Sequence, residues 1–144
     1  MIELTDEMRT LIANSATDGV PMVMSSVDSD GQPFLAYYGT AQALGTDQVA
    51  IWVRNPDSAM FERIRNNPRV SFVYWNRQIR TLLQLHGRAR IETDEAIRNT
   101  VFENSPEIER RLDPDRKGTA IVADLTLVRG SASGVRILME RDPA

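Results

Sequence analysis

The sequence contains no cysteine and a single histidine among its 144 residues. Disulfide bonds, thiol catalysis and cysteine-ligated metals are therefore excluded, and one histidine cannot build a multi-histidine metal site. No apolar run approaches the roughly eighteen residues that a membrane-spanning helix needs. The acidic N-terminus, MIELTDEMRT, lacks the apolar core of a signal peptide. These absences lead us to expect a cytoplasmic protein with no metal centre and no membrane anchor.

Positive charge is not in excess either. The chain has 17 Lys and Arg residues against 20 Asp and Glu residues, so its net charge is −3. A general nucleic-acid-binding protein normally presents a basic surface, and that class is therefore disfavoured. The length fits one domain, so we assign residues 1–144 to a single domain and expect a small molecule as its ligand.

The sequence is rich in short β-type segments separated by turns. Turn-forming residues such as DSDG (28–31) and GTDQ (45–48) lie between runs of apolar and β-branched residues. Short connections favour antiparallel pairing. The pattern predicts a mainly β protein with strands at residues 20–27, 34–44, 49–53, 70–75, 81–91, 119–128 and 135–139.

Several of these predicted strands are apolar on both faces, including residues 20–27, 49–53 and 70–75. In an antiparallel sheet this pattern indicates that both faces are covered. The interior of a barrel covers one face, and a partner subunit can cover part of the other. In residues 81–91 apolar side chains alternate with mostly polar ones, so one face of that strand is expected in the core.

Helical segments interrupt the strands. Thr5 is a preferred N-cap for a first helix, and spacings of four between apolar residues predict a helix at 94–104 and a shorter one after residue 106. The carboxylates in these last two helices, Glu103, Glu107 and Glu109, are interpreted as parts of solvated helix faces.

A further helix is predicted directly after Arg54, where the strand at 49–53 ends. Asn55 is a preferred N-cap, and Pro56 suits the first helical position. The helix is expected to end at the Asn-Asn-Pro sequence of residues 66–68, because the residue before a proline disfavours the helical conformation. Arg54 should therefore lie beside the start of a helix.

The start of a helix attracts anions through its unpaired N–H groups. Ser58 can add a hydroxyl donor, and the guanidinium of Arg54 can hold a phosphate through two hydrogen bonds. The local sequence therefore allows an anion site at Arg54, Asn55 and Ser58. The alternative is a surface ion pair between Arg54 and Asp57, which contributes less than about 1 kcal/mol.

Four short stretches carry a resemblance to a known family: GQPF (31–34), Ser58, NNPRVSF (66–72) and HGRARI (86–91). Together they span about half of the chain, and they resemble the pyridoxamine 5′-phosphate oxidase-like family, the FMN-binding split barrels. The resemblance implies a homodimer with two flavins at the interface. With the segments above, it gives a six- to seven-stranded antiparallel split β-barrel flanked by short helices.

The flavin contacts of this family match poorly, residue by residue. Its pattern places an arginine, two lysines and a glutamine where this chain has Ala36, Ala41, Met60 and Leu82. Of the contact residues compared, only Ser58 matches. Arg54 stands where the family commonly has a small hydroxyl residue, and because a guanidinium can hold a phosphate through two hydrogen bonds, we expect it to replace the missing positive charge.

Three further residues are expected beside the flavin ring. Tyr37, Tyr38 and Gly39 lie in the strand that should border the isoalloxazine, and a glycine lets a flat ring approach the backbone closely. The alternative is that the two tyrosines are core or interface aromatics. Trp52 and Trp75 are interpreted as packing residues.

These observations together predict an FMN-binding flavoprotein, a homodimer that transfers two electrons to or from a small molecule. No general acid or base is identified. A deazaflavin-dependent reductase, whose longer cofactor could lie along Arg88 and Arg90, is the first alternative. A protein on the same fold that binds haem at His86, or that binds no cofactor, is the second.

Overall fold

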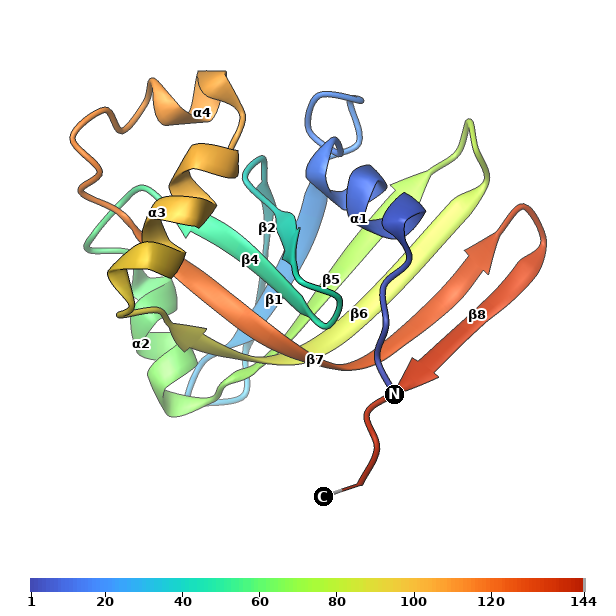
Figure 1. Cartoon of the computed structure of the whole chain (residues 1–144). Coiled ribbons are helices and arrows are strands. Elements are labelled where there is room, and N and C mark those ends of the chain that lie inside the picture. The colour runs from blue at the N-terminus through green and yellow to red at the C-terminus, as the bar shows by residue number, and fades with distance from the viewer. Residues whose placement is uncertain (144) are drawn as a thin grey trace.

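The computed structural model describes residues 1–143 and is built on one strongly curved antiparallel sheet (Figure 1). The order across the sheet is β2-β1-β5-β6-β7-β4-β3, and β8 pairs with the C-terminal half of β7. The prediction of a mainly β, antiparallel split barrel is confirmed. The strands are β1 (Met22–Val27), β2 (Pro33–Tyr38), β3 (Gln42–Leu44), β4 (Gln48–Val53), β5 (Arg69–Asn76), β6 (Thr81–Ile91), β7 (Thr119–Ala132) and β8 (Val135–Glu140).

The described residues form eight strands because the single strand predicted at 34–44 is wrong. A turn at residues 39–41 divides it into β2 and β3. The turn is fixed by Thr40, whose Oγ1 accepts a hydrogen bond from the Trp52 N–H at 2.9 Å and donates one to the Trp52 carbonyl at 3.1 Å. Both partners are buried, so the hydroxyl secures the β2–β3 corner against β4.

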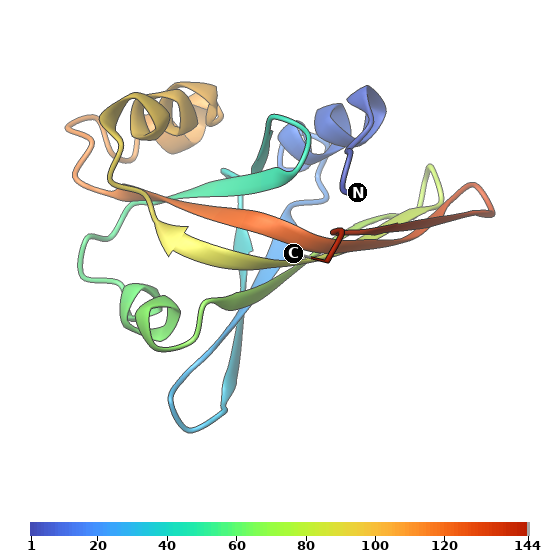
Figure 2. The ribbon, with the colours of Figure 1, turned by 60° about the horizontal axis from the view of Figure 1, so that its bottom comes forward.

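Helices α1 (Asp6–Ala13) and α2 (Ala59–Asn66) both pack into the barrel interior, and α2 lies beside the β1–β2 hairpin (Figure 2). Helix α3 (Glu95–Asn104) packs on the opposite face of β4, and the short helix α4 (Glu107–Arg110) follows it. The Thr5 cap is confirmed, because its hydroxyl accepts a hydrogen bond from the Met8 N–H. The short helix predicted after residue 106 is also confirmed as α4.

The predicted start of α2 is wrong by one turn. The helix begins at Ala59, and its N-cap is Ser58, whose hydroxyl accepts a hydrogen bond from the Met60 N–H at 3.3 Å. Asn55 instead closes a turn, because its side-chain oxygen accepts the Asp57 N–H at 3.0 Å and its carbonyl accepts the Ser58 N–H. Competition of this kind is common for Asn, whose side chain readily bonds to nearby backbone.

Two hydrophobic clusters account for the strands that are apolar on both faces. β4 contributes to both: Val49, Ile51 and Val53 point into the barrel interior, whereas Ala50 and Trp52 pack under α3. Trp52 meets Phe102 of α3 edge to face, with the ring centroids 5.1 Å apart. The prediction that both faces of residues 49–53 are covered is therefore confirmed.

Within residues 1–143, the outer face of β1, β2, β5 and β6 has no such cover. Val23 of β1 lies between Tyr37 of β2 and Val73 of β5, and Trp75 of β5 lies opposite Leu82 of β6. Tyr37 is 73% exposed and Trp75 is 53% exposed. The interpretation of Trp75 as a packing residue is therefore wrong within one chain. These five residues are called the outer apolar face below.

Within residues 1–143, no helix has both the length and the apolar character needed to cross a membrane. The cytoplasmic location expected from the sequence stays a prediction.

Candidate functional site

A pocket of about 480 Å³ lies where the ends of β2 and β4 meet the segment that contains α4. Its volume falls in the range of small-molecule sites, about 300–1,000 Å³. Five of the six residues predicted to bind a cofactor lie in its wall, and only Ser58 does not. The lining residues are Tyr37, Tyr38, Gly39, Thr40, Trp52, Val53, Arg54, Asn55, Glu109 and Leu112.

Arg54 follows β4 directly, and its side chain enters the pocket half-exposed. Its Nε lies 3.8 Å from Oε2 of Glu109. The alternative pair between Arg54 and Asp57 is not formed among residues 1–143. The interpretation of Glu109 as part of a solvated helix face is wrong, because α4 is held over the pocket and directs this carboxylate into it.

Gly39 faces the same carboxylate. A β-carbon added at Gly39 would lie 2.6 Å from Oε1 of Glu109, so the Glu109 carboxylate would have to shift to make room for it. The open side of this glycine, where a flat ring was expected, is therefore the place that Glu109 occupies. Two of the predicted site residues, Arg54 and Gly39, meet one carboxylate that the sequence did not identify as part of the site.

Asp113 supports the pocket from behind and is 7% exposed. Its carboxylate accepts hydrogen bonds from Trp52 Nε1, from the Gly118 N–H and from the Lys117 N–H at 2.9–3.0 Å. Burial pushes the pKa of Asp113 upward, but these donors and the charge of Arg54 outweigh that effect and leave the pKa below its usual value. The carboxylate thereby joins the loop before β7 to β4.

The two tyrosines point to opposite sides of β2, as neighbours on a strand do. Tyr37 lies on the outer apolar face, at the pocket's rim. Tyr38 is half-buried, and its hydroxyl lies 4.0 Å from the sulfur of Met60. Burial raises the pKa of the Tyr38 hydroxyl, and the charge of Arg63 partly opposes this rise. Tyr38 therefore lines the pocket with an uncharged hydroxyl group.

Two positions where the family pattern has lysine lie inside the barrel core. Ala41 is 3% exposed and Met60 is 2% exposed, and both pack in the main hydrophobic cluster. A cation at either place would be surrounded by apolar side chains. Because Arg54 is the one cationic residue in the pocket wall, the chemistry available there is the binding of an anion beside an aromatic rim.

His86, Arg88 and Arg90 do not join this pocket. All three are exposed on the polar face of β6, as the alternation predicted. Arg90 is paired with Glu92 and with Asp124, at 3.3 Å and 3.0 Å. Within residues 1–143, no group of three or more His, Asp or Glu side chains is placed to hold a metal ion.

The sequence matches one known protein family. A sequence profile described as pyridoxamine 5′-phosphate oxidase matches residues 4–130 of the chain. No curated protein matches it.

Many solved structures share the fold, and three of them serve as examples. An FMN-binding, pyridoxamine 5′-phosphate oxidase-related protein from Nostoc punctiforme aligns with a TM-score of 0.74 at 12% identity, over 94% of this chain and 88% of that one. HupZ of Group A Streptococcus aligns at 0.66 and 18%, over 93% and 98%. An FMN-binding protein from Syntrophomonas wolfei aligns at 0.65 and 10%, over 88% of each chain. At these identities the likeness concerns the fold.

Proposed function

This chain belongs to the pyridoxamine 5′-phosphate oxidase family, and on that basis we propose that it binds FMN in the pocket at Arg54. The observation that carries the proposal is the convergence of Arg54, Asn55, Tyr37, Tyr38 and Gly39 in one pocket wall. FMN carries a phosphate dianion, which requires a donor with compensating charge. Arg54 is the residue of this pocket that meets that requirement.

The residues present fit the two ends of a flavin nucleotide differently. The guanidinium of Arg54 suits the phosphate, since it can donate two parallel hydrogen bonds to it. Tyr37, exposed at the rim, and the backbone notch at Gly39 offer flat surfaces for the ring. Ser58 caps α2, and its hydroxyl oxygen accepts a hydrogen bond from the Met60 N–H. A contact with the phosphate would use the O–H of the same hydroxyl as donor. Ser58 stays a predicted contact.

When bound, FMN would supply the two-electron redox chemistry, and we propose a small molecule as the partner in that reaction. The protein's part is to bind, orient and exclude water. Arg54 would anchor the phosphate, and the β2–β3 corner at Thr40 and the side chain of Leu112 would form parts of the wall around the ligand. No residue of the pocket is assigned as a general acid or base.

We further propose a homodimer that covers the outer apolar face. β2 is an edge strand composed of PFLAYY, and all but its last residue are exposed. An exposed apolar edge strand invites pairing or cover. Tyr37 also lines a second, more apolar hollow with Val73 and Trp75, so the cofactor pocket opens beside this face. A second copy of the chain packed there would bring the pocket to the subunit interface.

The dimer predicts that a charge on the outer apolar face produces monomers. Trp75→Asp should shift the protein from dimer to monomer in light scattering at micromolar concentration, because an unpaired charge would be buried at the interface. Ile108→Asp is the matched control, since Ile108 is 71% exposed on α4 and lies off this face. A wild-type protein that is already monomeric at high concentration contradicts the proposed dimer.

The proposal is tested by the visible spectrum of freshly purified protein and by titration with FMN. We expect flavin absorbance as isolated, or quenching of FMN fluorescence on addition to the colourless protein. A deazaflavin spectrum would favour the alternative cofactor, for which the exposed Arg88 could line a longer groove. A colourless protein that leaves FMN fluorescence unchanged contradicts the proposed function.

A further inference from the structure

The carboxylate of Glu109 stands at the place where an anionic group of a ligand would meet Arg54. Its Oε2 is the atom paired with Arg54 Nε at 3.8 Å, and its Oε1 occupies the notch at Gly39. From this we propose that Glu109 is an internal competitor: its carboxylate holds the anion site until the anionic group of a ligand displaces it. The inference rests on the proposed function for the identity of the ligand and adds to it the residue that sets charge selectivity.

The ion pair between Glu109 and Arg54 is weak enough for a ligand to replace it. A separation of 3.8 Å exceeds the distance of an N–H⋯O hydrogen bond, so the two groups attract through space without a directed contact. Among residues 1–143 the Glu109 carboxylate accepts no hydrogen bond, and its one ion pair is that with Arg54. Asp113, by contrast, is held by three hydrogen bonds. Of the two acids whose charge Arg54 faces, Glu109 is the one that is free to leave.

The segment that carries Glu109 can move without disturbing the core. α4 has four residues, and none of them is buried. An ion pair between Arg110 and Glu103 at 3.7 Å joins α4 to α3, and both of these side chains are partly exposed. Elements with few buried side chains open at small cost in free energy. Withdrawal of Glu109 therefore leaves the barrel and the Trp52–Asp113 bond intact.

This arrangement discriminates between ligands by charge. A phosphate dianion offers Arg54 a stronger, hydrogen-bonded partner than the carboxylate it replaces. A neutral ligand of the same shape does not replace the ion pair and must share the pocket with Glu109. Removing the charge of Glu109 should therefore strengthen the binding of anions and leave the binding of neutral ligands nearly unchanged.

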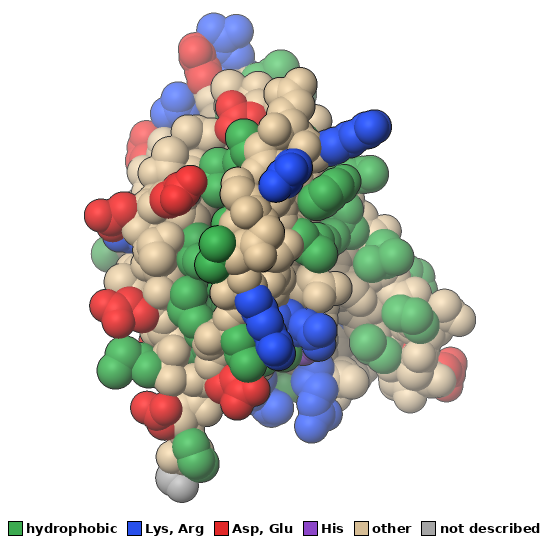
Figure 3. All heavy atoms as spheres, turned by 90° about the vertical axis from the view of Figure 1, so that its right-hand side faces the viewer, with side chains coloured by type: hydrophobic (Ala, Val, Ile, Leu, Met, Phe, Trp, Pro, Cys, Tyr) green, Lys and Arg blue, Asp and Glu red, His purple; other side chains and the backbone are tan. Residues whose placement is uncertain are grey.

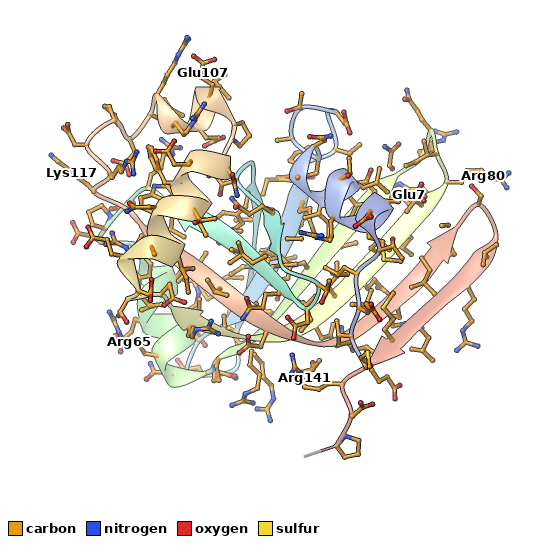
Figure 4. All side chains as sticks on the ribbon, in the orientation of Figure 1. Glu7, Arg65, Arg80, Glu107, Lys117 and Arg141 are labelled. Atoms are coloured by element: carbon orange, nitrogen blue, oxygen red, sulfur yellow. The ribbon has the colours of Figure 1, made fainter. Side chains whose placement is uncertain are left out.

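The experiment compares Glu109→Gln with Glu107→Gln, using FMN, riboflavin and inorganic phosphate as probes in calorimetric titrations. Glu107 lies on the same short helix at its outer end (Figure 4) and is paired with Arg111, so its replacement controls for the general loss of one negative charge. We expect Glu109→Gln to bind FMN and phosphate about ten-fold more tightly than the wild type, because like charges at a binding site oppose each other. Riboflavin binding should change by less than about two-fold on the same grounds. Glu107→Gln should behave as the wild type.

A double variant removes the remaining ambiguity. In an Arg54→Ala background, Glu109→Gln should give no gain, because the contested cation is absent. A gain that persists there, or unchanged or weaker binding of phosphate and FMN by Glu109→Gln itself, overturns the competitor role. If phosphate binding tightens but no variant binds a flavin, the proposed function fails and the competitor role stands. If the wild type binds FMN and Glu109→Gln changes neither FMN nor phosphate binding, the competitor role fails and the proposed function stands.

Discussion

Arg54→Ala should weaken the binding of FMN by ten-fold or more, since a hydrogen bond to a charged group contributes about 1.5–3 kcal/mol. The reason is that Arg54 is the one cationic residue in the wall of the pocket, while Ala41 and Met60 are buried among apolar side chains. Fluorescence titration measures the effect directly. Riboflavin, which lacks the phosphate, should bind the variant and the wild type with similar affinity.

Arg65→Ala is the matched control for this prediction. Arg65 lies on the outer surface of α2, where it is 62% exposed and paired with Glu62 at 3.6 Å (Figure 4). Its removal takes the same charge from the protein and leaves the pocket untouched. Equal FMN affinity in Arg54→Ala and Arg65→Ala would remove Arg54 from the binding site.

The second large effect is expected on stability, from Asp113→Asn. The amide keeps the volume of the carboxylate but loses its charge, and one of its two ends donates where the carboxylate accepts. If the amide nitrogen replaces Oδ2, both Trp52 Nε1 and the Gly118 N–H face another donor, and if it replaces Oδ1, the Lys117 N–H does. We expect the free energy of unfolding to fall by about 2–3 kcal/mol at pH 7, the cost of one buried group left without a partner, as measured by urea denaturation.

The pH dependence of this loss has a defined sign. The pKa of Asp113 is lowered in the folded protein, so its contribution to stability is complete above the unfolded-state pKa of about 3.9. It is lost as the pH falls through the folded-state pKa. The stability gap between wild type and Asp113→Asn should therefore shrink when the pH is lowered to about 3. Asp115→Asn, an exposed change in the same loop, should show no gap at either pH.

Much of the fold was predictable from the sequence because local patterns and long-range packing agree. The alternation of β6, the cap at Thr5 and the two apolar faces of β4 are each visible in a few consecutive residues, and each is confirmed. The division of residues 34–44 was not predictable. It depends on a hydrogen bond between the Thr40 hydroxyl and the backbone of Trp52, twelve residues away, and an apolar run gives no sign of it.

The site was predictable to the extent that it lies along β2 and the end of β4. Arg54 and Gly39 were identified from their places beside a turn and in a strand, and they line one pocket. Glu109 and Asp113 were missed because their roles arise from the way the segment around α4 folds back over β4. The sequence offered one usable signal, the short helix after residue 106, but it did not indicate which face of that helix meets the barrel.

The exposed apolar side chains on the surface bear on the predicted homodimer. Figure 3 shows apolar side chains spread over the side formed by the β5–β6 and β7–β8 hairpins, with Lys and Arg side chains in both its upper and its lower part. The apolar residues of 70–75 indicated cover on both faces, yet Trp75 is exposed in the single chain. One of the two apolar faces of residues 70–75 is thus left uncovered in the single chain, and this is the physical reason for proposing a second subunit on the outer apolar face.

The most direct test of the central claim is a crystal structure of the protein grown with saturating FMN. The account predicts phosphate density within about 3 Å of the Arg54 guanidinium, the ring beside Tyr37 and Gly39, and the Glu109 carboxylate turned away from the notch. A flavin bound elsewhere, or a pocket in which Glu109 still faces Arg54 and no phosphate is present, would contradict it.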